Sequence, residues 1–333
     1  MARQLRIQVS GAFYLVTNKS EARNGLFRDD DERRIFLDCL METCNKTGWK
    51  IHAYSLVKEG YYLLLECPEP NLVDGMKWFQ GAFTAKVNKK RNRRESLFPR
   101  RYRSVIIDPK AKGIFKAAGD FIHSAPVWNK STKANLANFK WSSLLDYKAP
   151  KSKRAKWIQT SKILGDSKLK DDTTGRKKYY QQVSSAGKMA SGSHIDEELA
   201  AEWKPLQRGW FYGSKKFHQD LLSNIAKARA GKTPGKSSPK NTHGEAMARN
   251  IIKSGLKALK LTEAKLNKLP LGADEKIALA SVLRNKTTIS QDWISKKLKM
   301  GHRTNVSNGI TKVKNDETGT LAKLVRAIEK AIK

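Results

Sequence analysis

Short runs of β-branched and aromatic residues mark four strands in the N-terminal part of the chain. They are residues 12–18 (AFYLVTN), 49–57 (WKIHAYSLV), 61–67 (YYLLLEC) and 102–108 (YRSVIID). Only Lys58, Glu59 and Gly60 separate the second run from the third. We therefore expect these two strands to form a hairpin.

Two helical patterns lie between the strands. Residues 28–48 carry acidic residues in the first turn and an apolar stripe, and Gly48 is expected to end this helix. Asn71 with Asp74 resembles a capping box that opens a second helix. The apolar stripe of that helix consists of Leu72, Met76, Phe79, Phe83 and Val87. The order βαββαβ predicts an α+β, ferredoxin-like split arrangement whose sheet leaves one face free.

Changes in composition divide the rest of the chain. We predict a first domain, a basic and partly disordered connector, a helical extension, a flexible linker rich in Gly, Pro, Ser and Lys, and a C-terminal all-α domain. Their bounds are residues 1–128, 129–196, 197–228, 229–245 and 246–333.

The C-terminal domain contains the pattern of a helix-turn-helix. Ser290 can cap a helix that carries Trp293, Ile294 and Leu298, with Trp293 as a core residue. Residues 300–302 then form a tight turn, and residues 274–286 supply a supporting helix. The second helix of the motif places Val306, Ile310 and Val313 on one face. The alternative is a small helical bundle that binds no partner.

The charge of the chain narrows the choice of partner. Its 66 Lys and Arg against 31 Asp and Glu give a net charge of +35, which favours a polyanion such as nucleic acid. No apolar run is long enough to span a bilayer, and the N-terminus lacks the apolar core of a signal peptide. Cys39, Cys44 and Cys67 form no C-x-x-C pair, so we expect reduced thiols in a cytoplasmic protein.

Several motifs in residues 1–128 occur together in one known family. They are GAFYLVT, HAYSLV, CPEPNLVDGMKWFQGAFTAKVNKK, SLFPRRYRSVIID and FIHSAPV. In this order and spacing they resemble the REP-associated tyrosine transposases, which are single-tyrosine transposases of the HUH superfamily. The resemblance implies a bacterial DNA-binding protein associated with the nucleoid. It also implies hairpin or palindromic DNA as partner, and a homodimer formed through the N-terminal domain.

The resemblance also implies that the catalytic groups are missing. In the family, two histidines just before LLLE hold a divalent metal such as Mg²⁺ or Mn²⁺, and this chain has Gly60 and Tyr62 there. The family's YIHLNPV provides a Tyr nucleophile and an Asn metal ligand, where this chain has Phe121 and Ala125. Phenylalanine has no hydroxyl to attack phosphorus. We expect no intact catalytic residue, no metal site and no cofactor.

Two other functions stay open at this stage. One is an active transposase with displaced residues, in which Tyr61, Tyr62 or Tyr102 is the nucleophile. The other is an RNA-binding or nucleoid-organising protein that uses the same basic face. His52 and His123 match positions outside the family's metal shell and are expected to be structural.

Two groups of residues are predicted to contact DNA. The first lies in the run KVNKKRNRRESLFPRRYR, which suits phosphate contact with base stacking on Tyr102 and Phe98. It comprises Lys86, Lys89, Lys90, Arg91, Arg93, Arg94, Arg100, Arg101, Tyr102 and Arg103. The second lies at the start of the predicted recognition helix, where base edges are within reach. It comprises Arg303, Thr304, Asn305, Ser307 and Asn308, with Lys312 on phosphate.

Overall fold

In the computed structural model the chain forms two compact units. The first comprises Met1–Cys44 and Gly48–Lys236, and the second comprises Asn45–Thr47 and Ser237–Lys333. The structure describes residues 7–20, 25–94, 96–98, 100–128, 136, 139–191, 197–230 and 243–332. The expected linker at residues 229–245 lies largely outside these ranges.

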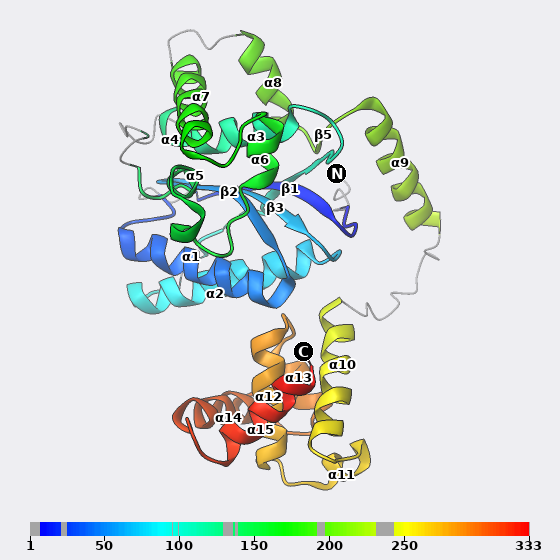
Figure 1. The fold of residues 1–333 in the computed structure, drawn as a ribbon. Helices are drawn as coiled ribbons and strands as arrows, with labels where there is room; N and C mark the ends of the chain where they lie inside the picture. The colour runs from blue at the N-terminus through cyan, green and yellow to red at the C-terminus, as the bar shows by residue number, and fades with distance from the viewer. Residues whose placement is uncertain are drawn as a thin grey trace. The chain divides into compact units, whose positions relative to one another are not determined.

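The first unit has a sheet with helices on both of its faces (Figure 1). Its first six elements follow the predicted order, and the α+β class is confirmed. They are β1 (Ala12–Lys19), α1 (Asp30–Thr47), β2 (Lys50–Val57), β3 (Gly60–Cys67), α2 (Leu72–Arg91) and β4 (Arg103–Ile107). A fifth strand, β5 (Phe211–Tyr212), completes the sheet order β2-β3-β1-β4-β5.

The register of the sheet determines which side chains share a face. Strand β1 lies between β3 and β4 and is antiparallel to both, and β2 is antiparallel to β3. Strand β5 runs parallel to β4. Because neighbouring residues of a strand point to opposite faces, Tyr14 and Val16 join one core while Phe13 and Leu15 join the other.

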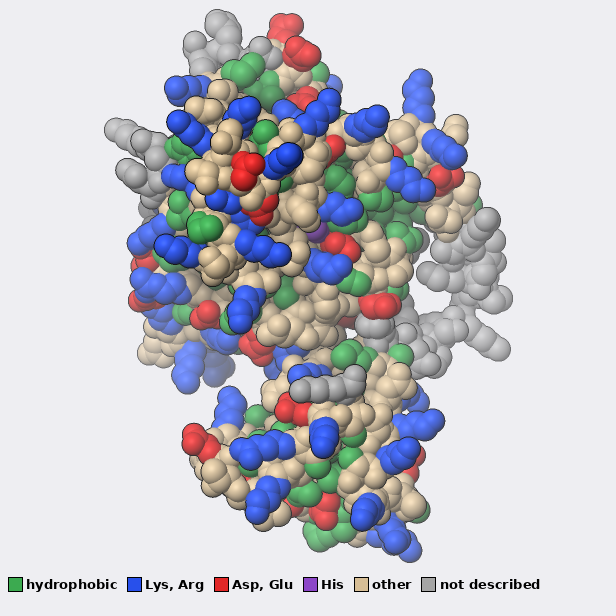
Figure 2. Space-filling view, viewed as in Figure 1, with side chains coloured by type: hydrophobic (Ala, Val, Ile, Leu, Met, Phe, Trp, Pro, Cys, Tyr) green, Lys and Arg blue, Asp and Glu red, His purple; other side chains and the backbone are tan. Residues whose placement is uncertain are grey.

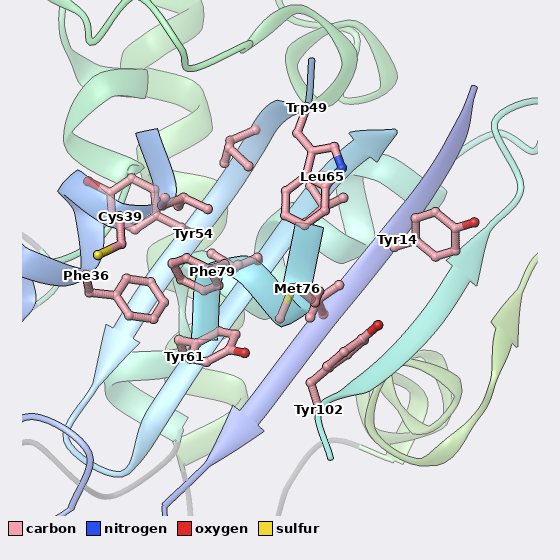
Figure 3. Packing of buried hydrophobic residues seen from close by; sticks show 14 of the residues in the cluster. Tyr14, Phe36, Cys39, Trp49, Tyr54, Tyr61, Leu65, Met76, Phe79 and Tyr102 are labelled. Atoms are coloured by element: carbon pink, nitrogen blue, oxygen red, sulfur yellow. The ribbon is translucent and has the colours of Figure 1, made fainter. Parts of the chain in front are cut away.

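Helices α1 and α2 cover the first face (Figure 3). Helix α1 begins because the side chain of Asp29 accepts a hydrogen bond from the backbone N–H of Glu32. It ends at Gly48, whose φ of 73° is the left-handed conformation that glycine adopts most easily. Phe36 and Phe79 pack edge to face between these helices, with ring centroids 4.8 Å apart.

The predicted capping box at the start of α2 does not form. Asn71 is the residue before the helix, but its side chain makes no capping hydrogen bond. Its Oδ1 instead accepts a hydrogen bond of 2.7 Å from the indole Nε1 of Trp49. Trp49 is buried, so its N–H needs a partner inside the protein, and Asn71 supplies one.

The second face of the sheet is covered, contrary to the free face expected from the sequence. Six helices follow β4 and pack their apolar side chains against this face. They are α3 (Ile114–His123), α4 (Ala125–Trp128), α5 (Leu144–Lys148), α6 (Ser161–Asp166), α7 (Thr173–Ser191) and α8 (Glu197–Arg208). Leu15 and Leu64 on this face are fully buried, and uncovered they would expose a large apolar surface.

The predicted connector at residues 129–196 is also corrected. Residues 129–135 and 192–196 lie outside the described residues, but residues 139–191 are ordered and contain α5 to α7. Tyr147 and Tyr179 from this stretch are fully buried and stack with ring centroids 4.8 Å apart. A few large apolar residues among many lysines are enough to attach the stretch to the sheet.

Backbone hydrogen bonds continue the sheet beyond β2 and beyond β4. Beyond β2, the N–H of Leu56 donates to the carbonyl of Trp141, and the N–H of Gln159 donates to the carbonyl of Ile51. Beyond β4, β5 pairs through Ile106 with Phe211. Helix α9 (Lys215–Ala230) follows β5. Such pairing protects the strand edges from added strands.

The second unit consists of helices packed around one core. They are α10 (His243–Ala258), α11 (Glu263–Lys268), α12 (Asp274–Lys286), α13 (Gln291–Lys297), α14 (Arg303–Asn315) and α15 (Thr320–Ala331). Lys276 of α12 is buried, and its Nζ donates to the carbonyls of Leu269 and Lys299. This lysine therefore ties α12 to the turn between α13 and α14.

The three cysteines of the chain, Cys39, Cys44 and Cys67, are all buried, and none of them forms a disulfide. Within the described ranges, no helix has both the length and the apolar character needed to cross a membrane.

A buried ion pair joins α1 to α2. Arg91 and Glu32 have side chains that are only 4% and 1% exposed, and two hydrogen bonds of 2.7 Å connect them. Glu32 also accepts from the backbone N–H of Arg28, and Arg91 also donates to the carbonyl of Leu26. The pair therefore fixes the loop before α1 as well as both helices.

We predict that Arg91→Ala lowers the free energy of unfolding by about 3–5 kcal/mol, because it leaves the Glu32 carboxylate buried without its partner. The matched control is Lys90→Ala. It removes the same charge one residue away, where Lys90 pairs with Asp29 at an exposed site. Urea unfolding followed by tryptophan fluorescence measures both. Equal, small losses for the two variants would contradict the structural role of Arg91.

Candidate nucleic-acid interface

Four aromatic side chains meet where the family resemblance places the catalytic site. The ring centroids of Tyr62 on β3 and Phe121 on α3 are 5.7 Å apart. Trp128 stacks on Phe121 at 4.9 Å, and Trp203 of α8 contacts Phe121 edge to face at 5.4 Å. We call Tyr62, Phe121, Trp128 and Trp203 the aromatic cluster. Phe121 is 1% exposed, so DNA does not reach this position in the structure.

The other two positions of the expected site are equally closed. Ala125 is fully buried in the same core as Phe121. At Gly60, a Cβ atom would lie 2.2 Å from the carbonyl oxygen of Asn18 on the neighbouring strand β1. A histidine at residue 60 would therefore require the two strands to move apart.

The three tyrosines that could replace the missing nucleophile are buried. Tyr61, Tyr62 and Tyr102 are 0%, 4% and 6% exposed, and Figure 3 shows Tyr61 and Tyr102 among the core side chains. Burial raises the pKa of Tyr62 well above its usual value, which makes the phenolate harder to form. Among the described residues, no group of three or more His, Cys, Asp or Glu side chains is arranged to hold a metal ion.

His123 lies beside the aromatic cluster and has structural partners on both ring nitrogens. Its Nδ1 is 2.7 Å from the hydroxyl of Tyr179, and its Nε2 is 2.8 Å from the hydroxyl of Ser143. Complete burial disfavours the imidazolium and lowers the pKa of His123 to about 3. A neutral imidazole suits these two hydroxyls, because one nitrogen can donate and the other can accept.

His52 lies on the same face of the sheet, at a bulge in β2. Its Nε2 is 3.4 Å from Oε2 of Glu66, and its ring contacts Phe13 and Phe115. The nearby His52 ring, followed by the Lys50 ammonium 3.1 Å from Oε1, lowers the pKa of Glu66 to about 2. These contacts place His52 in the packing of the sheet rather than in an open site.

The predicted DNA-binding run at residues 86–103 divides into exposed and structural residues. Seven cations are exposed, and five of them lie at the end of α2 and in the segment between α2 and β4: Lys89, Arg93, Arg94, Arg100 and Arg101. We call these five residues the basic cluster. In the view of Figure 2, Lys and Arg side chains are spread over the surface of this unit among fewer acidic ones.

Leu97 and Phe98 hold the loop that carries the basic cluster. Leu97 is buried, and Phe98 packs partly buried against Tyr61 and Phe83, with ring centroids 6.1 and 6.0 Å away. The predicted stacking role of Phe98 is therefore replaced by an anchoring role. The Nδ2 of Asn18 also donates to the carbonyl of Arg100, which fixes the far end of the loop.

Three residues predicted to contact DNA are structural instead. Arg91 forms the buried pair with Glu32. Arg103 donates to the carbonyls of Leu206 and Gly209 near the end of α8. Tyr102 lies in the core beneath α2 and cannot stack on a base. Each is a large polar side chain that the sequence alone does not distinguish from its exposed neighbours.

Two further lysines of the run are exposed but paired. Lys86 lies 3.5 Å from Glu42, and Lys90 lies 2.8 Å from Asp29 and 3.2 Å from Asp31. Asp31 and Glu42 belong to α1, and Asp29 is the residue directly before that helix. They offset part of the positive charge along α2.

An open hollow of about 440 Å³ lies at the end of α2. Asn88, Lys89, Asn92, Arg93 and Arg94 line it. Amide and guanidinium groups together can donate several hydrogen bonds to phosphate oxygens. Asn92 adopts the left-handed conformation that ends the helix, with φ of 49°, and so turns the chain toward the hollow. Asn88 and Asn92 carry no charge, so the pattern of cationic residues in the sequence does not point to them.

In the second unit, α13 and α14 lie where the sequence pattern places them. The side chain of Ser290 accepts a hydrogen bond from the N–H of Trp293 and so caps α13. Gly301, with φ of 75°, makes the turn before α14. Trp293 packs half-buried against the core of the unit. Lys276 of α12 donates a hydrogen bond to the carbonyl of Lys299 in this turn.

The residues predicted on α14 differ in their availability. Arg303, Thr304, Asn308 and Lys312 are exposed. Asn305 donates to the carbonyl of Met300, and Ser307 donates to the side chain of Gln291. Asn305 and Ser307 therefore hold the turn and α13 in place, and the other four predicted residues are part of the exposed face of α14.

This chain is similar over part of its length to a solved structure. No family model and no curated protein matches the chain. Among solved structures, it is similar to that of a REP-associated tyrosine transposase bound to a REP hairpin, with 14% identity and a TM-score of 0.39. The similarity covers 44% of this chain and 84% of that one. A TM-score this low does not establish a shared fold.

We predict that acid destabilises the first unit through His123. The folded-state pKa of about 3 lies below the usual 6.5, so the unfolded state binds the proton first and stability falls as the pH drops below 6.5. Between about pH 7 and about pH 5 this group should remove about 2 kcal/mol.

The measurement is urea unfolding of wild type and His123→Gln over this pH range. The stability difference between them should narrow on acidification. The control, Gln181→Ala, changes an exposed residue of the same unit that carries no titratable group, and it should leave the difference from wild type constant. A His123→Gln protein that loses stability in parallel with wild type would contradict the prediction.

Proposed function

We propose that this chain is a DNA-binding protein derived from a REP-associated tyrosine transposase, and that it grips hairpin or single-stranded DNA without cleaving it. The observation that carries the proposal is the basic cluster. Three of its exposed cations, Lys89, Arg93 and Arg94, line a hollow together with the amides of Asn88 and Asn92. Arg100 and Arg101 are exposed after the anchored residues Leu97 and Phe98. Such an arrangement suits a phosphate backbone, because contacts to phosphate need positive charge and donors but no base-specific geometry.

The proposed origin rests on motifs and on topology together. The motifs of residues 1–128 resemble those of the transposase family, and the order β2-β3-β1-β4 with α1 and α2 on one face suits the ferredoxin-like split arrangement. Helices α3 to α8 and strand β5 would then be additions to that arrangement.

The proposed loss of cleavage rests on the aromatic cluster and on Gly60. Cleavage by a tyrosine needs a hydroxyl beside a metal-polarised phosphate. Phe121 supplies no hydroxyl, its surroundings are filled by Tyr62, Trp128 and Trp203, and Gly60 leaves no space for a metal-binding side chain. The buried state of Tyr61, Tyr62 and Tyr102 gives no support to a displaced nucleophile.

For the second unit we propose a helix-turn-helix that adds contacts to duplex DNA. Helix α14 would be its recognition helix, with Arg303, Thr304 and Asn308 toward base edges and Lys312 toward phosphate. The support is the exposed face of α14 and the capped, tightly turned connection to α13. The remaining alternative, a partner made of RNA, is an outcome that the binding experiment distinguishes.

We predict that the basic cluster determines the salt dependence of hairpin DNA binding. Replacing Arg94, Arg100 and Arg101 by Ala should reduce the slope of log affinity against log salt by roughly two to three units, since about 0.7–0.9 is lost per phosphate contact. Fluorescence anisotropy with a labelled hairpin measures the slope, and a matched RNA hairpin shows whether DNA is preferred.

The matched control replaces Lys151, Lys153 and Lys156 by Ala. These lysines are also exposed, so the same charge is removed elsewhere in the first unit. The control should leave the slope within about one unit of wild type. If both triple variants change it equally, the binding depends on overall charge and the basic cluster is not a site.

We predict that the protein forms no covalent adduct with hairpin DNA in Mg²⁺ or Mn²⁺, as judged on a denaturing gel, while binding persists in EDTA. Phe121→Tyr alone should not produce an adduct, because its hydroxyl would enter the aromatic cluster without a metal. A denaturation-resistant adduct on the unmodified protein, lost in Tyr61→Phe, Tyr62→Phe or Tyr102→Phe, would overturn the inactive assignment.

A further inference from the structure

Three aromatic rings form a second, more open group at the edge of the sheet. Phe211 of β5 and His218 of α9 lie almost parallel, with ring centroids 4.3 Å apart and an angle of 4°. Trp210 lies against both, at 4.9 Å from Phe211 and 5.4 Å from His218. We call Trp210, Phe211 and His218 the edge aromatics.

The backbone around the edge aromatics is held firmly. The N–H of Ile106 donates to the carbonyl of Trp210 at 3.0 Å, and Arg103 donates to the carbonyl of Gly209. On the other side, the hydroxyl of Ser214 donates to Asp108 at 2.8 Å. The rings are therefore presented by a paired strand and by the first turns of α9, not by a loose loop.

The exposure of the edge aromatics differs from that of the aromatic cluster. Tyr62, Phe121 and Trp203 are buried, whereas all three edge aromatics are half-buried and keep part of their rings at the surface. Trp210 and Phe211 contact the core with one part of their surface only. Core packing alone does not require three aromatic rings in a row at the surface.

Positive charge surrounds the edge aromatics. Arg208 precedes them in the chain, and Lys215 and Lys216 lie between Phe211 and His218; all three side chains are exposed. Arg101 of the basic cluster precedes β4, the strand with which β5 pairs. Aromatic faces flanked by cations are the combination that binds single-stranded nucleic acid, since bases stack on the rings and phosphates meet the charges.

We propose that the edge aromatics are a stacking platform for unpaired nucleobases of single-stranded DNA. The proposal deepens the DNA-binding function proposed above and rests on it. Duplex bases are stacked on one another and do not offer their faces, so the platform selects unpaired nucleotides. Arg208, Lys215 and Lys216 hold the phosphates on either side of the stacked base. Stacking tolerates every base, so the platform adds affinity for single strands without sequence preference.

The experiment compares two single-stranded DNA probes of equal length and phosphate charge. One carries bases throughout, with a fluorescent 2-aminopurine in its centre, and the other has abasic sites at its central positions. Wild type should bind the base-containing probe roughly 5- to 100-fold more tightly, and stacking should quench the 2-aminopurine. Trp210→Ala and His218→Ala should each lose most of this preference and leave affinity for the abasic probe unchanged.

The matched control is Trp157→Ala. Trp157 is also half-buried against the same core, where it stacks on Tyr54, but it lies beyond β2 at the opposite end of the strand order. This variant should keep the full preference for bases. Two substitutions in the platform, each checked by circular dichroism, separate loss of stacking from loss of folding.

The outcomes distinguish this inference from the function on which it rests. Equal affinity of wild type for the two probes, with no quenching, would overturn the platform and leave phosphate binding by the basic cluster intact. An equal loss of preference in Trp157→Ala would also overturn it. Failure of wild type to bind either probe or hairpin DNA would overturn the proposed function itself, and the platform with it.

Discussion

The packing of apolar side chains on both faces of one sheet is the constraint on which the first unit depends. Leu15 and Leu64 on one face and Val16 and Leu63 on the other are all fully buried. Since a sheet of this kind cannot leave either face in water, two layers of helices are needed. Helices α1 and α2 supply one layer, and α3 to α8 supply the other.

This constraint explains why the surface available for binding lies at the edges and helix ends. The aromatic cluster fills the position where a cleavage site was expected, so the polar and charged side chains that remain accessible lie around it. The basic cluster lies in the last turn of α2 and in the segment after it, and the edge aromatics lie at the outer strand. The proposed function therefore needs no opening of the core, because phosphates would bind to the basic cluster and unpaired bases to the edge aromatics, both of which lie at the surface.

The elements of the first half of the chain could be predicted from the sequence because their patterns are local. Alternating and helical spacings of apolar residues place β1 to β4, α1 and α2 within a few residues of their observed bounds. The caps by Gly48 and Ser290 follow from residue type in the same way.

What the sequence could not predict depends on contacts between distant residues. Arg91 and Arg94 look alike in sequence, but only Arg91 meets Glu32 inside the protein. Asn71 has the residue type of a helix cap, but its side chain accepts a hydrogen bond from Trp49, which is distant in sequence. Helices α5 to α7 were missed because few apolar residues, such as Tyr147 and Tyr179, carry their attachment to the sheet.

Hydrogen–deuterium exchange of the full chain, with and without hairpin DNA, tests most directly where the DNA binds. The account predicts new protection in peptides covering residues 88–101 and 303–312. It predicts no change in residues 60–64 and 114–125, which hold the aromatic cluster on β3 and α3. Altered exchange in these latter peptides, with none in residues 88–101, would show that DNA enters the covered face of the sheet and would contradict the account.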